Sequence, residues 1–127
     1  MEERFNDISE FFSYLLDVPA TAWRFHLATD SYSEHMALND FYENVQDDID
    51  SLVECYFGKY GKLGFLTPLE NPFANVGDSV SFLEGVLDDV ASANQQFVEF
   101  EDSELQSALD DIISEIDSTL YKLKNLR

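Results

Sequence analysis

The sequence contains only one cysteine and two histidines among its 127 residues. The lone Cys55 excludes an internal disulfide and a zinc site built from thiolates, because both need more than one thiol. Long apolar runs are also absent, and none approaches the roughly 20 residues that span a bilayer. The first residues are acidic and lack the basic and apolar regions of a secretory signal. These absences predict an intracellular, cytoplasmic protein with no membrane partner.

Basic residues are scarce, since seven lysines and arginines stand against 26 aspartates and glutamates, for a net charge of -19. Such a surface repels phosphate backbones, so we expect no direct binding to DNA or RNA. Three roles for the charge stay open at this level. It keeps the protein in solution, it attracts metal ions or other cations, or it mimics nucleic acid toward a basic protein partner.

Apolar residues recur every three or four positions through most of the chain, and no alternation typical of strands appears. With 45% apolar and 26% charged residues, the composition is that of a globular protein. We therefore predict one all-α domain over residues 1–127. Because proline lacks the donor that a helix interior needs, Pro19 predicts a kink or a restart within the first helix. The expected helices cover residues 5–27, then run from Asp30 or Ser31 to about 57, from Asp78 or Ser79 to about 94, and from Asp102 or Ser103 to the C-terminal turn.

One long connection divides this helical pattern into two halves. Residues 58–77 contain four of the five glycines and two of the three prolines, which predicts a loop. Short links within each half make its two helices antiparallel neighbours. Two such hairpins joined by one long crossover loop predict a four-helix bundle of the ferritin-like kind.

One group of residues in the first two helices could bind a metal ion: His26, His35, Asp50 and Glu54. Asp50 and Glu54 are four residues apart, so both carboxylates leave the same face of a helix. His35 lies about 22 Å further along that helix, too far to reach the same ion. Two antiparallel copies can bring His35 of one to the carboxylates of the other. An imidazole with two carboxylates suits iron or another borderline divalent metal.

The segment SYSEHMALNDFY, followed by Asp50-x-x-x-Glu54, resembles the Dps family of ferritin-like proteins. It is also similar to small ferritin-like proteins of tailed phages. The resemblance covers about residues 20–60 and implies metal ligands at His35, Asp50, Glu54 and His26. In Dps proteins these ligands form a ferroxidase site across a two-fold dimer interface. One departure is Asn39, which stands where the family has an acidic residue.

Two functions follow as hypotheses. The resemblance implies a homo-oligomer, at least a dimer, that binds iron and is a ferroxidase if the metal site is intact. The alternative is a non-catalytic acidic protein of phage type, located in the host cytoplasm, which keeps the bundle without the metal. It would bind a basic host protein or mimic nucleic acid. The acidic residues between 99 and 117 are then either a solvated helix face or a partner-binding face. Trp23 and Cys55 are expected in the core.

Overall fold

The computed structural model describes residues 4–126, so both ends of the predicted 1–127 domain lie outside the described residues. Within this range the chain contains helices and no strand. No helix of the described range is long and apolar enough to cross a membrane. The prediction of an all-α chain whose four helices pack together is confirmed. The helices are α1 (Ile8–Ala28), α2 (Tyr32–Tyr60), α3 (Ser79–Phe97) and α4 (Ser103–Asn125).

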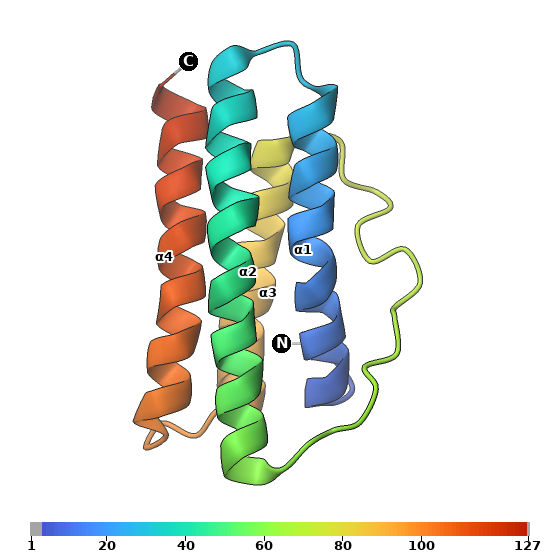
Figure 1. Cartoon of the computed structure of the whole chain (residues 1–127), viewed down its shortest axis with the longest axis vertical. Helices are drawn as coiled ribbons and strands as arrows, with labels where there is room; N and C mark the ends of the chain where they lie inside the picture. The colour runs from blue at the N-terminus through green and yellow to red at the C-terminus, as the bar shows by residue number, and fades with distance from the viewer. Residues whose placement is uncertain (1–3, 127) are drawn as a thin grey trace.

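The helices form a four-membered ring in which α2 and α3 each contact both α1 and α4. Figure 1 shows that α1 and α4 run in one direction along the bundle, whereas α2 and α3 run in the other. The connection between α2 and α3 follows the outer side of α1 from one end of the bundle to the other (Figure 1). This path returns the chain to the end at which α2 began, so α2 and α3 are parallel.

Each helix begins at a short polar side chain that accepts a hydrogen bond from a backbone N–H three residues further on. These N-caps are Asp7, Ser31, Asp78 and Asp102. The Glu34 N–H donates to the Ser31 hydroxyl at this cap. The Glu34 carboxylate accepts from the Ser79 hydroxyl, which joins the starts of α2 and α3.

The predicted restart at Pro19 is wrong, because α1 is one continuous helix from Ile8 to Ala28. Proline removes one backbone donor, but the buried side chains on both sides lie on one continuous helix face. Val18 and Ala22 are 1% and 0% exposed. The Pro19 ring is itself buried and lies beside Ile49 of α2. Packing on both sides of the proline therefore offsets the missing hydrogen bond.

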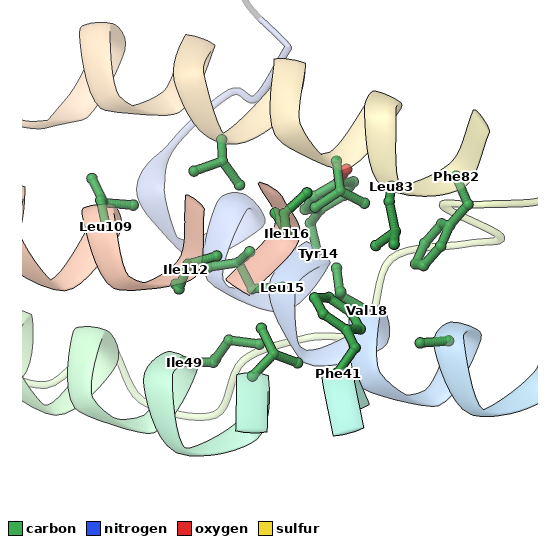
Figure 2. Close-up of a cluster of buried hydrophobic side chains, with 14 of the residues drawn as sticks. Tyr14, Leu15, Val18, Phe41, Ile49, Phe82, Leu83, Leu109, Ile112 and Ile116 are labelled. Carbon is green, nitrogen blue, oxygen red and sulfur yellow. The ribbon is translucent and has the colours of Figure 1, made fainter. Parts of the chain in front are cut away.

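The core consists of apolar side chains that all four helices direct inward, as Figure 2 shows for one cluster. The predicted apolar faces of α2, α3 and α4 are confirmed in their central positions. Flanking positions such as Val80, Leu87 and Ile113 are only half-buried. Fully buried members include Leu15, Leu38, Phe41, Val45, Leu83, Val90, Leu109 and Ile116.

The connection between α2 and α3 is held against α1 by both apolar and polar contacts. Leu66 and Phe73 pack on the core, and the Ser13 hydroxyl donates to the Thr67 carbonyl at 2.6 Å. Nearby, the Tyr14 hydroxyl donates to Asp89 of α3 at 2.7 Å. Burial and the adjacent Asp89 carboxylate raise the pKa of Tyr14 far above its ordinary value, so this bond keeps its proton.

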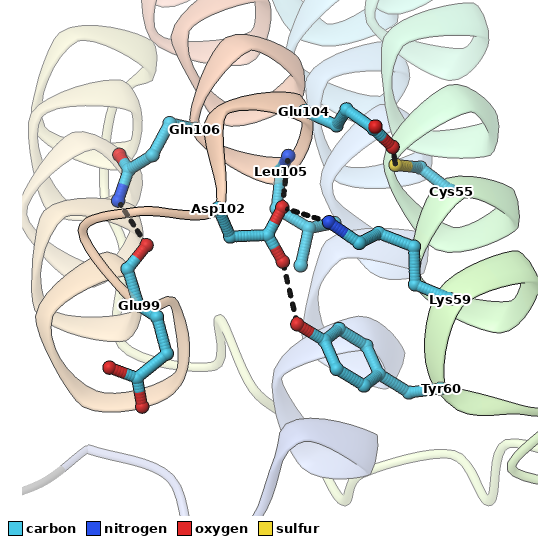
Figure 3. Close-up of polar contacts among 8 residues, drawn as sticks. All are labelled: Cys55, Lys59, Tyr60, Glu99, Asp102, Glu104, Leu105 and Gln106. Atoms are coloured by element: carbon cyan, nitrogen blue, oxygen red, sulfur yellow. Dashed lines mark hydrogen bonds and ion pairs between the residues drawn. The ribbon is translucent and has the colours of Figure 1, made fainter.

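Asp102 joins the end of α2 to the start of α4 (Figure 3). Its carboxylate caps α4 through the Leu105 N–H, pairs with Lys59 at 2.6 Å and accepts from the Tyr60 hydroxyl at 2.7 Å. Asp102 is 6% exposed, so three donors surround a charge that is nearly removed from water. The hydrogen bonds from Lys59 and Tyr60 lower the pKa of Asp102 below its ordinary value of 3.8.

We expect Asp102→Ala to lower the midpoint of thermal unfolding by several degrees at neutral pH. Asp102→Asn should lose less, because asparagine still caps a helix but cannot pair with Lys59. Since the folded pKa of Asp102 is depressed, its stabilisation is present above 3.8 and disappears as the pH falls through the folded value. Thermal unfolding followed by circular dichroism should show a smaller difference in midpoint between wild type and Asp102→Asn at about pH 3 than at about pH 7. A gap of equal size at both pH values would contradict this account.

Candidate metal site

His26 and His35 face each other where α1 turns into α2. Their rings stack with centroids 3.6 Å apart and planes 20° apart. Nδ1 of His26 lies 2.7 Å from the His35 carbonyl oxygen, and Nδ1 of His35 lies 2.9 Å from the His26 carbonyl oxygen. A carbonyl oxygen only accepts, so each Nδ1 carries a hydrogen. The lone pair of each neutral ring is therefore on Nε2, the arrangement in which metal-ligating histidines are commonly held.

The stacking makes it difficult for both rings to bind one ion. A nitrogen lone pair lies in the plane of its ring, so two nearly parallel stacked rings keep their lone pairs in separate planes that do not converge on one point. His26 is also buried, with 7% of its surface exposed, whereas His35 is half-buried. Of the two predicted histidine ligands, His35 is therefore better placed, and His26 serves to orient it.

Asp50 and Glu54 lie on an exposed part of α2, further along the helix than the histidines. Neither carboxylate forms a hydrogen bond or an ion pair with any residue in the range 4–126. Asp50 borders a hollow of about 280 Å³ between α1 and α2, next to Trp23, Gln46 and other side chains. Both carboxylates are thus free to take part in contacts from outside the chain.

The structure brings together only two of the four predicted ligands, His26 and His35. Across the described chain, no three histidine, cysteine, aspartate or glutamate side chains converge on one point that could hold a metal ion. The separation expected along α2, about 22 Å between residues 35 and 50, explains why one copy does not close the site.

An apolar stripe lies on the outer side of α1 next to this hollow. Its members, Leu16, Ala20, Trp23 and Leu27, follow one another at steps of four, three and four. Trp23 was expected in the core and is instead 51% exposed, with its ring stacked on Tyr42 at 5.3 Å. Helix α1 carries apolar residues on two faces, and spacing alone did not distinguish the buried face from the exposed one.

A second group of carboxylates lines the opposite side of α2, where it meets α4. Burial, followed by repulsion from Asp111, raises the pKa of Asp48 above its ordinary value. Burial and then repulsion from Asp48 raise the pKa of Glu115 in the same way. Spacing along the chain did not reveal that α2 contributes to this acidic surface. Cys55, expected to be buried, is half-buried, and its sulfur lies 4.0 Å from Glu104 (Figure 3).

A family model matches residues 26–123, which is most of the chain. The chain belongs to DUF5856, a family of unknown function. The DUF5856 match begins at His26 and includes His35, Asp50 and Glu54, whereas the apolar stripe of α1 lies largely before it. No curated protein and no solved structure matches the chain.

The reciprocal hydrogen bonds between the histidines can be tested by substitution. We expect His26→Ala to lower the free energy of unfolding by about 1–3 kcal/mol, because the His35 carbonyl loses its side-chain donor in a mostly buried setting. His35→Ala should cost less, because His35 is more exposed. Urea unfolding of both variants gives this comparison. In the wild type, ring ¹⁵N shifts should report the Nδ1–H form of both neutral histidines, and an Nε2–H form in either ring would contradict the arrangement.

Proposed function

We propose that this protein binds ferrous iron at a site shared by two copies of the chain. His35 of one copy would supply an imidazole nitrogen, and Asp50 and Glu54 of the other would supply carboxylate oxygens. The observation that carries the proposal is the state of these three side chains in a single copy. His35 is held with its Nε2 lone pair available, and the two carboxylates have no partner among residues 4–126.

The donor set and the helix arrangement both support this proposal. One imidazole and two carboxylates form a ligand set that suits iron and similar divalent metals. Two antiparallel hairpins joined by one long connection are also the architecture of ferritin-like bundles. The resemblance of residues 20–60 to Dps proteins favours the same superfamily, in which such ligands meet between subunits. His26 would act by holding His35 in position through its backbone carbonyl.

Anaerobic titration of the metal-free protein with Fe(II), followed by isothermal calorimetry, tests the binding. A two-fold pair has two equivalent sites, so we expect one ion per chain. Asp50→Asn should weaken binding at least tenfold, because it removes a charged ligand at a cost of more than about 1.4 kcal/mol. Asp110→Asn is the matched control, since it changes the net charge equally on an exposed part of α4. Equal affinity in the two variants would place the iron elsewhere.

Ferroxidase activity is a separate part of the proposal and depends on the same ligands. Admitting dioxygen to the Fe(II)-loaded protein would transfer electrons from ferrous iron to oxygen, and a near-UV ferric signal would record it. Asn39 provides an amide where Dps proteins have a carboxylate. Binding without oxidation would therefore indicate a protein that keeps the metal and has lost the reaction.

The acidic surface between α2 and α4 favours a second candidate, a non-catalytic interaction protein that binds a basic partner. The raised pKa values of Asp48 and Glu115 reflect burial together with repulsion between carboxylates. A nearby cationic partner would reduce this repulsion. A phage-type protein of this kind would occupy a basic host surface or mimic nucleic acid.

Capture of partners from lysate at low and high salt tests this candidate. We expect a basic protein whose recovery falls steeply as the ionic strength rises, because added salt screens exposed charges. Replacing Asp48, Asp111 and Glu115 with their amides should reduce capture, whereas Asp50→Asn should not. Recovery that is unchanged at high salt would contradict an interaction driven by charge.

A further inference from the structure

We infer that the α1/α2 face of this chain docks onto a second copy of itself, with Trp23 of each copy filling the hollow of the other. The α1/α2 face comprises the apolar stripe of α1 and the adjoining hollow, bordered on α2 by Gln46, Ile49 and Asp50. This inference identifies Trp23 as the main contact residue between the two copies that share the metal site. The relative position of the two copies along α2 rests on the proposed function.

The charge of the chain limits where a second copy can dock. Two molecules of charge -19 repel each other, so they can associate only where charge is sparse and apolar area is exposed. The apolar stripe of α1 satisfies this condition, because none of its four members is charged. A basic partner would instead be drawn to the acidic surface between α2 and α4.

The shape of the face also fits a copy of itself. A two-fold interface uses the same patch on both subunits, so every protrusion needs a matching recess within that patch. The α1/α2 face carries both, since Trp23 is half exposed and borders a hollow of about 280 Å³. The Trp23 indole stacks on Tyr42 with an angle of 16° between the ring planes, which holds the indole against α1 and α2 in the single chain. A rigid aromatic side chain next to a recess is typical of the residues that dominate binding energy at interfaces.

The positions of the proposed metal ligands determine where the two-fold axis between the copies would lie. If His35 of one antiparallel α2 meets Asp50 of the other, the axis must cross α2 midway between them, near Tyr42. Trp23 stacks on Tyr42, so the axis that the metal site requires passes beside the indole. Because the hollow extends from Trp23 toward Asp50, each indole is then placed against the hollow of the other copy.

Analytical ultracentrifugation of the full chain in chelator tests the docking without metal. We expect the wild type to dimerise and Trp23→Ala to weaken the dimer at least tenfold, as for other aromatic interface anchors. Leu16→Glu should have a similar effect, because it adds charge at the edge of the hollow without removing a core side chain. Phe100→Ala is the control, since Phe100 is 89% exposed in the turn between α3 and α4. A monomeric wild type, or dimers that survive both α1 substitutions, would overturn the inference.

Glu54→Gln separates this inference from the proposed function. We expect this variant to dimerise in chelator as the wild type does, and to bind iron more weakly. That result would support both the docking and the metal site. A dimer that depends on Trp23 in a wild type that binds no iron would uphold the docking and reject the metal site. Iron binding that depends on Glu54 while Trp23→Ala remains dimeric would uphold the metal and reject this docking face.

Discussion

Burial of apolar side chains between the four helices holds this chain together against its own charge. A fully buried side chain such as Phe41 or Leu83 contributes about 1.5–3 kcal/mol. Of the three ion pairs within residues 4–126, Arg4–Asp89 and Lys124–Glu84 lie at the surface, where each contributes about 0–1 kcal/mol. Acidic side chains elsewhere, such as Asp48 and Glu115, repel one another. Stability therefore comes from the core, which leaves the acidic surface free to serve interaction or solubility.

Helix α1 differs from a helix with a single buried face, because it carries apolar side chains on two faces. One of its faces fills the core, and its outer side presents the apolar stripe around Trp23. This stripe contains no charged residue, although the chain has 26 aspartates and glutamates. Because it adjoins the hollow bordered by Asp50, the site proposed for iron and the surface proposed for a second copy are parts of one face.

The two histidines link the α1–α2 hairpin to the proposed metal site. Their reciprocal hydrogen bonds join the end of α1 to the start of α2 and satisfy two backbone carbonyls with side-chain donors. The same bonds leave His35 with a lone pair on Nε2. A residue pair that stabilises the hairpin thus also orients the imidazole on which the metal proposal depends.

The sequence alone determined the helices, their caps and most of the core, because helical periodicity and capping are local properties of a few consecutive residues. Helices α2, α3 and α4 begin within two residues of their predicted starts, and the apolar face of α2 packs inward as predicted. Tertiary structure decided the position of Trp23 and the unbroken course of α1 through Pro19. It also decided that the His26 ring stacks on the His35 ring. These outcomes depend on which face of α1 meets α2, and that choice is made by packing between segments distant in the chain.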